Sequence, residues 1–593
     1  MLAIILVSSA FINHALSQSL CKVTPSDASW PSASEWSGLN SSIGGVLLAT
    51  QPVGSSCYAD QSFSSPFSCD DVNKNWAYST FHAATPESID YPFFANNTCV
   101  PPSATGYDAN KLCTLGGLPA YVVNATNEHQ IATAVRWADQ RNIRIVIKGT
   151  GHDLNGRSAG AHSLSIWTRN LNKIEFKPQW QIPGDGVSDV FVVGSGVSWG
   201  DVNLAGAAVN KVAISGQDKT VGLGGFIQAG GHGPMSSHYG LSADNIYQAT
   251  VVTIAGEILV ANDAQNQDLL WAIRGGGPGL WGVVTEFVLK AHPMPENVVS
   301  STLSMSPNTN VSTAVADSWK GLAAFLASLP DLMDSGLTGS GFGSSSDLGA
   351  KLSLSFFGYN TTVEKVQALL EPVKQRILDQ GHNFTLSAAL SQPQTGTYMD
   401  LFNSLNSAPS GAGAASLISS RLLGRAALVD LPLDRLASNL QQVMVSQSGK
   451  GSTLVVGLQG GRGPAEVEES RRGALNPAWR IGYVHTMVTG INIDLKKAPQ
   501  DALAEAAAWA EENKEKVWRA WTPETGAYIN EASGFDKNFK NDFYGANYNR
   551  LLQLKNKYDP NGSLYVLSGV GSDLWDYNLT TGRLCRQDVQ HND

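Results

Sequence analysis

The sequence predicts an α+β protein with two main lobes, on three observations. First, a strand at 120–123, an amphipathic helix at 127–141 and a strand at 143–147 follow one another, in the order of a β-α-β unit. Second, apolar strand-like runs after this unit alternate with glycine-dense turns. Third, the pattern changes after Pro293 and Pro295, where helical and strand-like runs mix as in an α+β lobe.

Periodicity predicts the elements of the first lobe. In the helix at 127–141, Asn127 and Gln130 resemble an N-cap and its partner, and one face is apolar; this face carries Ile131, Ala134, Val135 and Ala138. Further strands are predicted at 190–193, 249–254 and 281–289, the last with the continuous apolar pattern of a buried strand. The turn 148–156 follows the carboxyl end of a strand, where α/β proteins tend to hold ligands.

The second lobe is predicted as a substrate domain at 296–520, with an antiparallel sheet backed by helices. Its helices are predicted at 363–378 and 502–521, and its strands at 352–357 and 454–458. In the last segment, 521–593, a helical stretch at 544–560 ends at Asp-Pro. We expect this segment to return to the first lobe.

Length and charge limit the class of partner. With 593 residues, of which 42% are hydrophobic and 15% charged, the chain is long enough to bury large cores, which excludes a disordered protein. The net charge is -10 and there is no cluster of Lys and Arg, so nucleic acid is not an expected partner. A small-molecule substrate is the better hypothesis, and the sequence gives no indication of the oligomeric state.

The N-terminus is typical of a signal peptide at 1–17, although it lacks a basic start. Met1 to Val7 is apolar, and Ala15-Leu-Ser17 has the small-x-small pattern of a cleavage site. The apolar stretch is too short to span a bilayer, so no membrane anchor is expected. The sequence therefore predicts secretion.

Cysteine usage agrees with an oxidising compartment. Five of the six cysteines lie in the segment 18–112 or just after it, and their spacing fits no zinc site. Short loops favour Cys57 with Cys69 and Cys99 with Cys113, but six cysteines allow fifteen pairings. We expect 18–112 to be an extended, disulfide-tied segment without catalytic residues. Glycosylation is predicted from sequons at Asn40, Asn96, Asn124, Asn310, Asn360, Asn383, Asn561 and Asn578.

The glycine turns do not match the common phosphate-binding fingerprints. Gly149-Thr-Gly151 reaches Leu154 at the sixth position and Gly222-Leu-Gly224 reaches Ile227, so neither is G-x-G-x-x-G, and a Gly-Lys-Ser/Thr loop is absent. Several separate turns of this kind can each direct backbone N–H groups at phosphate oxygens. Together they suit a long ligand such as a dinucleotide.

An ordered series of motifs carries a family resemblance. It consists of Lys148-Gly-Thr-Gly-His152-Asp153, Thr220-Val-Gly-Leu-Gly-Gly225, Gly230-Gly-His-Gly-Pro234, Tyr239-Gly-Leu-Ser-Ala-Asp-Asn245, Asp268-Leu-Leu-Trp-Ala-Ile-Arg-Gly-Gly-Gly277 and Lys555-Asn-Lys-Tyr-Asp-Pro560. The series resembles the FAD-linked oxidoreductases of the vanillyl-alcohol oxidase superfamily, in their berberine bridge enzyme-like branch. The resemblance implies a PCMH-type FAD-binding domain at 113–295, before the substrate domain. It is clear there, moderate in the last fifty residues and weak in the substrate domain.

The resemblance implies that His152 is bonded covalently to the 8α position of FAD, and that Gly149, Thr150 and Gly151 line its pyrophosphate. The other residues that it places at the cofactor are Asp153, Thr220, Gly222, Gly224, Gly225, Gly230, Gly231 and Val283. An imidazole nitrogen can serve as the nucleophile for such a bond, and the bond makes the flavin a stronger oxidant. A lone histidine in a turn is more often structural, but the ordered series favours attachment.

The sequence departs from the family in two places, and one further position bears on oxygen access. Many relatives attach the flavin a second time through a cysteine before the Thr-Val-Gly turn, but the matching stretch 216–220 has no thiol. We therefore predict a single covalent link, at His152. Plant members commonly have tyrosine where this chain has Leu154, and Leu223 stands where relatives govern oxygen access to the flavin. The choice between oxidase and dehydrogenase stays open, with oxidase favoured.

A catalytic base is expected, because general-base assistance is typically worth about 10² to 10⁴ in rate. The candidates are Tyr528 and Glu531, which lie where relatives carry a tyrosine-containing strand, and Tyr544 and His485 are alternatives. His232 and the nearby His238 have no further ligand at metal spacing, so no metal is predicted.

These features predict a secreted FAD-dependent oxidoreductase. It would take a hydride from an alcohol, a sugar or a hydroxylated secondary metabolite and pass the electrons to O2, which gives H2O2. Two alternatives remain: an oxidative cyclase of secondary metabolism, and a non-catalytic secreted binding protein of the same fold.

Overall fold

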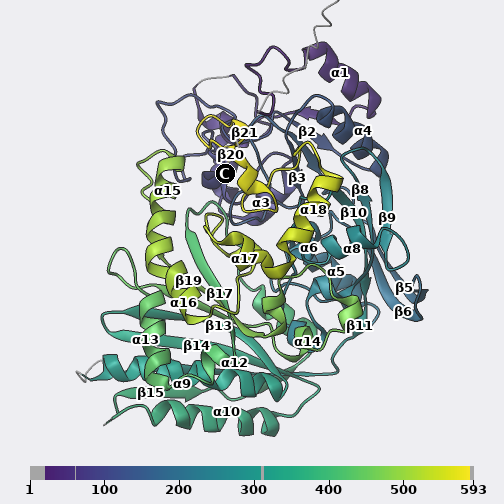
Figure 1. The fold of residues 1–593 in the computed structure, drawn as a ribbon. Helices are drawn as coiled ribbons and strands as arrows, with labels where there is room; N and C mark the ends of the chain where they lie inside the picture. Colours follow the sequence, from purple (N-terminus) through teal and green to yellow (C-terminus); the bar gives the residue numbers. More distant parts are fainter. Residues whose placement is uncertain (1–20, 60–61, 309–312, 383, 588–593) are drawn as a thin grey trace, which may run out of the picture.

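The computed structural model describes residues 21–59, 62–308, 313–382 and 384–587 of the protein. The predicted leader at 1–17 lies outside them. Within the described residues, helices and several sheets form two sheet-containing lobes, with the C-terminal segment in yellow packed between them (Figure 1). The predicted α+β fold class is confirmed. No helix in this part of the chain is both long and apolar enough to cross a membrane.

The first lobe contains two main sheets and a two-stranded sheet of β7 (Lys211–Val212) and β11 (His292–Pro293). One main sheet has the strand order β1-β2-β4-β3, and the other has the order β5-β6-β10-β8-β9. The strands of the first are β1 (Leu47–Ala49), β2 (Tyr121–Asn124), β3 (Ile145–Lys148) and β4 (Leu164–Trp167). Those of the second are β5 (Ile174–Gln181), β6 (Val187–Gly194), β8 (Ile246–Val252), β9 (Ile258–Asn262) and β10 (Val283–Lys290). The strands predicted at 120–123, 143–147, 190–193, 249–254 and 281–289 are all present, within a few residues.

The predicted β-α-β unit is present, but its two strands are not neighbours. Helix α4 (Glu128–Asp139) begins at the N-cap Asn127, whose side chain accepts from the backbone N–H of Gln130, and its apolar face is buried as predicted. Strand β4 pairs in parallel with both β2 and β3 and lies between them. The unit was recognisable because α4 is amphipathic, whereas β4 is buried along its whole length and has no alternation.

Shorter helices connect the strands of the first lobe and carry most of the glycine turns. They are α5 (Trp199–Ala207), α6 (Leu223–Gln228), α7 (Ser236–Tyr239) and α8 (Gln267–Ile273). A buried cluster that includes Trp199, Phe226, Trp281 and Phe287 packs these helices against the five-stranded sheet. The glycine turns are therefore part of a packed core and not of a linker.

The second lobe is an antiparallel eight-stranded sheet with helices on one face. Its order is β15-β12-β14-β13-β18-β19-β17, with β16 paired to β12. The strands are β12 (Val298–Pro307), β13 (Leu337–Ser346), β14 (Gly349–Tyr359), β15 (Leu386–Leu390), β16 (Gln394–Gly396), β17 (Leu417–Gly424), β18 (Thr453–Leu458) and β19 (Gly482–Ile491). Helices α9 (Ala314–Asp334), α10 (Val363–Leu378) and α13 (Leu433–Val443) lie together below the sheet in Figure 1.

The helix predicted at 502–521 is interrupted. It consists of α15 (Pro499–Ala510), a π-helical turn at Glu511–Glu515 and α16 (Lys516–Trp521). Within the π turn, the buried ammonium of Lys514 donates to the backbone oxygens of Val443 and Val445, at 2.6 and 2.8 Å. The wider turn places this cation against the end of α13, which a hydrophobic period cannot predict.

The expectation of an extended N-terminal segment is wrong, because the segment contains helices. These are α1 (Ala33–Ser42), α2 (Cys69–Asn75) and α3 (Ser79–Ala84). Ser32 and Glu35 form a capping box at α1, and Ser68 caps α2, so local hydrogen bonds define helices that are too short to show a period. The favoured disulfides Cys57–Cys69 and Cys99–Cys113 are both present, and a third, Cys21–Cys585, joins residues 564 positions apart.

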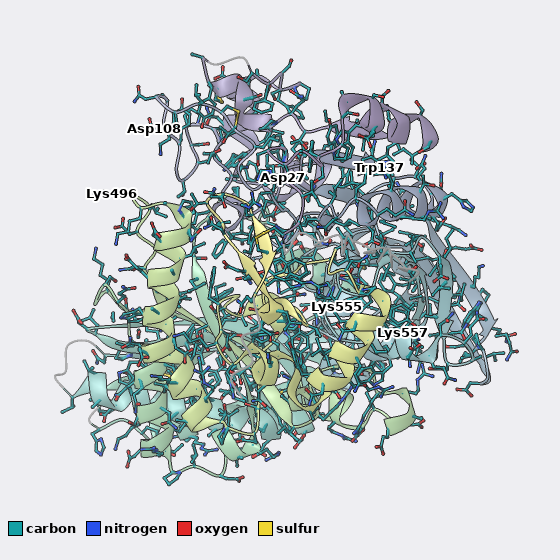
Figure 2. All side chains as sticks on the ribbon, turned by 45° about the horizontal axis from the view of Figure 1, so that its top comes forward. Asp27, Asp108, Trp137, Lys496, Lys555 and Lys557 are labelled. Carbon is teal, nitrogen blue, oxygen red and sulfur yellow. A yellow bond between two sulfur atoms is a disulfide. The ribbon has the colours of Figure 1, made fainter. Side chains whose placement is uncertain are left out.

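The C-terminal segment contacts both lobes. Its helices are α17 (Phe539–Tyr544) and α18 (Tyr548–Tyr558), with Gly545–Asn547 as a 3-10 turn between them. Figure 2 labels Lys555 and Lys557 on α18. Lys555 donates to the backbone oxygen of Leu280 at 3.3 Å, and the backbone N–H of Ile145 on β3 donates to Ser563 at 2.8 Å. These bonds fasten the segment to the strands that end at the site described below.

A buried ion pair fastens the same segment to the second lobe. Arg421 on β17 lies 2.9 Å from the Asp542 carboxylate, with both side chains at most 2% exposed. The same guanidinium donates to the backbone oxygens of Thr522 and Thr525. Removing one partner of such a pair leaves an uncompensated buried charge.

We therefore expect Asp542→Asn to lower the free energy of unfolding by about 3–5 kcal/mol. The exposed pair Arg462–Glu466 provides the control, since Glu466→Gln removes a surface interaction worth at most about 1 kcal/mol. Thermal unfolding of both variants measures the difference. Equal midpoints would show that the buried pair does not join the lobe to the C-terminal segment.

Candidate flavin cavity and active site

A cavity of about 380 Å³ opens where β3 ends and the C-terminal segment crosses the first lobe. Its wall includes the residues 149–154 of the turn after β3. It also includes residues of the glycine turn, Gly222, Gly224, Gly225 and Phe226, and residues before α17, Tyr528, Asn530 and Glu531. The side chain of Asn155 joins the first and last of these walls, since its Nδ2 donates to the backbone oxygen of Ala532 and its Oδ1 accepts from the N–H of Gly534.

The turn after β3 begins at a buried lysine. Lys148 is 1% exposed, and its ammonium donates to the backbone oxygens of His82 and Thr85 at 3.0 and 2.6 Å. Burial lowers the pKa of Lys148 to about 7, although the negative charge of Glu87 acts to raise it. Gly151 has a φ of +87°, and a Cβ there would lie 3.2 Å from the oxygen of Ser88, so this turn requires glycine.

His152 directs one nitrogen at four oxygen-bearing side chains. Its Nε2 lies 3.0 Å from Thr220 Oγ1, 3.3 Å from Ser410 Oγ, 3.6 Å from Asp218 Oδ2 and 3.8 Å from Asp90 Oδ2. Burial alone lowers the pKa of His152, but the hydrogen bond to Asp218 and the charges of both carboxylates raise it above its ordinary value. The ring is therefore held firmly, and its protonated form is stabilised.

Asp153 acts on the site through an arginine. Its carboxylate accepts from Nε of Arg157 at 2.9 and 2.8 Å, and Nη2 of the same guanidinium donates to the backbone oxygen of Ile529 at 3.2 Å. Both side chains line the cavity. Arg157 thus places a positive charge between the histidine turn and the C-terminal segment.

Most residues predicted at the cofactor line this cavity. Gly149, Thr150, Gly151, His152, Asp153, Gly222, Gly224 and Gly225 are all in its wall. Thr220 lies behind the wall against His152. Gly230 and Gly231 lie beside Tyr528, and Val283 is in the core between the lining residues Gly282 and Val284, so the side chain of Val283 does not reach the cavity.

The cavity is suited to a polar, elongated ligand. Ser195 Oγ, Gln228 Oε1 and Arg157 Nη1 belong to lining residues and are buried without a hydrogen-bond partner in the described part of the chain. A Cβ added at Gly225 would meet nothing within 4 Å, so the backbone there borders open space. Unsatisfied polar atoms beside exposed glycine backbone fit the phosphates and polar ring edge of FAD.

Glu531 lies between two imidazoles. Its Oε2 is 3.0 Å from Nε2 of His232 and 3.3 Å from Nδ1 of His485, which β19 contributes from the second lobe. Burial raises the pKa of Glu531, but the charge and hydrogen bond of His232 outweigh burial and lower it to about 2. Burial lowers the pKa of His485 to about 4. At neutral pH the site therefore combines an ionised carboxylate with a neutral His485.

The tyrosines differ in position and protonation. Tyr528 lines the cavity, its oxygen accepts from Nδ2 of Asn530 at 2.9 Å, and burial raises its pKa well above the ordinary value. Tyr544 instead donates to the backbone oxygen of Ser568 and is not in the cavity wall. Leu223 is fully buried in the core and is also absent from the wall. At neutral pH, Glu531 therefore presents an ionised carboxylate and Tyr528 a neutral hydroxyl.

The chain matches two family descriptions. "FAD binding domain" matches residues 119–262, and "Berberine and berberine like" matches residues 527–569. The VAO-type flavoprotein oxidase VAO615 of Thermothelomyces thermophilus is 34% identical over 97% of this chain and 96% of its own. The chain belongs to the VAO-type FAD-linked oxidoreductases.

Two other relatives agree. The bifunctional decalin synthase calF of Penicillium decumbens is 30% identical over 95% of each chain. The crystal structure of the VAO-type flavoprotein MtVAO615 from Myceliophthora thermophila C1 superimposes with a TM-score of 0.83 and 32% identity, over 96% of this chain and all of the other. The predicted family resemblance is therefore confirmed.

Sequence spacing missed part of this oxidoreductase site. His232, His485 and Glu531 were not recognised as a group, because three distant segments supply them, although their nitrogen and oxygen atoms lie within 4.8 Å of one another. His232 hydrogen-bonds to Glu531 and His485 lies 3.3 Å from the same carboxylate oxygen, and the expectation of no metal stays a prediction. Asp90 and Asp218 were also missed as partners of His152. For Asp218, the signal in the sequence was the lack of a thiol in its stretch, 216–220.

Filling the cavity tests whether it holds FAD. We expect Gly225→Val to weaken FAD binding by about 5- to 150-fold, since overpacking costs about 1–3 kcal/mol. Fold stability should not change, because the added side chain enters open space. Gly186→Val, at another glycine with nothing within 4 Å, is the control. The 450 nm absorbance of the folded proteins measures bound flavin, and an unchanged ratio in Gly225→Val would place FAD elsewhere.

Proposed function

We propose that this protein is a secreted oxidase that holds one FAD through a single covalent bond at His152. It takes a hydride from a hydroxyl-bearing carbon of an alcohol, a sugar or a hydroxylated secondary metabolite, and O2 accepts the electrons to give H2O2. The observation that carries the proposal is the shared cavity, whose wall contains both His152 and the Glu531 carboxylate that two imidazoles hold.

The cysteines support a single attachment. All six cysteines of the chain are in disulfides, so no thiol remains for a second flavin bond. Three disulfides also support secretion, because disulfides persist in oxidising compartments. The stretch where many relatives have a cysteine instead contributes Asp218, a carboxylate that faces His152.

Glu531 and Tyr528, which line the cavity before α17, have different acid–base roles in this proposal. When bound, FAD supplies the two-electron acceptor. Glu531 takes the proton of the substrate hydroxyl, and the imidazoles of His232 and His485 hold its Oε2 in place. Tyr528 accepts hydrogen bonds from Asn530 and from the backbone of Gly231, which leaves its own proton to donate to the substrate.

Oxidative ring closure is a second candidate, favoured by the decalin synthase among the relatives. Both reactions use the same cavity and differ in the product. A panel of alcohols and sugars, assayed for peroxide release, identifies an oxidase. Product mass and ring count identify a cyclase, and a protein that neither reduces flavin nor releases peroxide with any substrate would be a binding protein of the same fold.

Acid denaturation tests the covalent bond. We expect the yellow colour to stay with the wild-type polypeptide and to leave the polypeptide of His152→Ala, because only His152 is proposed to bond the flavin. Mass spectrometry of the peptide that spans residue 152 locates the added mass. Colour that leaves the wild-type chain would remove the covalent claim, and colour that stays with the variant would move the attachment to another residue.

Replacing the base tests the assignment of Glu531. We expect Glu531→Gln to lower kcat/KM by about 10² to 10⁴ while flavin binding is retained. Because the pKa values of Glu531 and His485 are lowered to about 2 and 4, wild-type kcat/KM should stay level from neutral pH down to about pH 4. Below about pH 4, His485 becomes protonated, and towards about pH 2 protonation of Glu531 removes the base and activity falls.

Glu515→Gln is the matched control for this substitution. Glu515 is also buried, lies outside the cavity wall, and burial raises its pKa to about 8, so it is already protonated at neutral pH. Substitution by glutamine should leave kcat/KM unchanged. Equal activity of Glu531→Gln and the wild type would exclude Glu531 as the base.

A further inference from the structure

We propose that Asp90 and Asp218 are positioning residues for flavin attachment, which hold the Nε2 proton of His152 so that Nδ1 presents its lone pair to the flavin. This inference rests on the proposed covalent link at His152. It assigns a role to the N-terminal segment, from which Asp90 comes and in which the sequence showed no catalytic residue.

Hydrogen-bond directions determine which nitrogen carries the proton. The hydroxyl of Thr220 donates to Oδ1 of Asp218 at 2.7 Å, so its oxygen is left to accept from Nε2 of His152 at 3.0 Å. The nearest oxygens of Asp90 and Asp218 lie on the same side of the ring. Since carboxylates only accept hydrogen bonds when ionised, this side of the imidazole favours Nε2–H. A neutral imidazole carries a proton on only one of its two nitrogens, so Nδ1 keeps its lone pair.

Asp90 has no evident structural role for its charge. Its side chain is 0% exposed, and within the described residues its oxygens make no well-aligned hydrogen bond, although the nearby Ser79 side chain acts to lower its pKa. Burial raises the pKa of Asp90, and the charge of His152 opposes this. A buried, poorly paired carboxylate is destabilising, and such groups concentrate at functional sites. The charged partner nearest to this carboxylate is the imidazole that is proposed to bond the flavin.

Backbone hydrogen bonds on both sides of Asp90 hold its carboxylate near His152. The N–H of Asp90 donates to the oxygen of Gly151 at 3.1 Å, and its own oxygen accepts from Gly413 at 2.7 Å. Lys148 binds the oxygens of His82 and Thr85 just before it. The segment is thus tied to the histidine turn on one side and to the second lobe on the other.

The bond change explains why two carboxylates are needed. Attachment would form a bond from Nδ1 to the 8α carbon and break a C–H bond of that methyl group. The methyl proton and the C–H electron pair would pass to the flavin, and O2 would take the two electrons together with this proton and the Nε2 proton to give H2O2. The substituted imidazole is positively charged until it loses the Nε2 proton. Asp90 and Asp218 stabilise this charge and accept the proton at Nε2.

The rate of attachment tests the inference. Full-length apoprotein from riboflavin-limited cells is supplied with FAD, samples are denatured in acid at intervals, and flavin on the polypeptide is measured by gel fluorescence and intact mass. We expect Asp90→Asn and Asp218→Asn each to slow attachment at least about tenfold, the factor for one unit of imidazole pKa. Native absorbance should show that FAD still binds before attachment.

Glu87→Gln is the matched control. Glu87 is a buried carboxylate in the same segment, and it acts on Lys148 and not on His152. Its substitution should leave the rate of attachment unchanged. A general loosening of the segment would slow this variant as well, which would overturn a specific role for Asp90.

The outcomes separate this inference from the proposed function. Wild-type protein that binds FAD but never attaches it removes the covalent link, and the inference with it. Attachment at the wild-type rate in both asparagine variants overturns the inference and leaves the function standing. If Asp90→Asn does not fold, Asp218→Asn provides the test, because the Asp218 side chain is one third exposed. Attachment of FAD to Asp218→Asn at the rate of the wild-type protein would then overturn the inference.

Discussion

The imidazole of His152 is the point on which the arrangement of the site depends. Three separate parts of the chain bring oxygen atoms to one ring nitrogen, through Asp90, through Asp218 with Thr220, and through Ser410. A buried charge is tolerated only where partners meet it, so the positions of these segments are coupled. The N-terminal segment, the glycine turns and the second lobe must all be in place before the ring is held.

Local patterns predicted the elements that position the histidine turn. Helix α4 has an apolar face and an N-cap within one short stretch, and the strands next to it are apolar runs, so each could be recognised alone. Strand β4 was missed because it is buried throughout and is inserted between β2 and β3. Helix α1 was missed because a capping box defines it more than its hydrophobic period does.

Prediction of the site also succeeded for contiguous motifs and failed for contacts between distant residues. The glycine turns were predictable because each is a contiguous motif, and eight of the residues assigned to the cofactor line one cavity. Contacts between distant residues were not predictable. Asp90 reaches His152 from the N-terminal segment, and His485 reaches Glu531 from the other lobe. Neither residue has a spacing to the rest of its group that a motif could describe, because only the folded topology brings them together.

Tyr528 and Glu531 show how the cavity separates acid from base. They are three residues apart and both line the cavity, yet their pKa values shift in opposite directions. Burial raises the pKa of both groups, but at Glu531 the charge and the hydrogen bond of His232 outweigh the effect of burial. The tyrosine therefore keeps its proton while the glutamate loses its own. Two titratable groups whose environments push their pKa values apart are what a hydride-transfer site requires, since one must donate a hydrogen bond while the other accepts a proton.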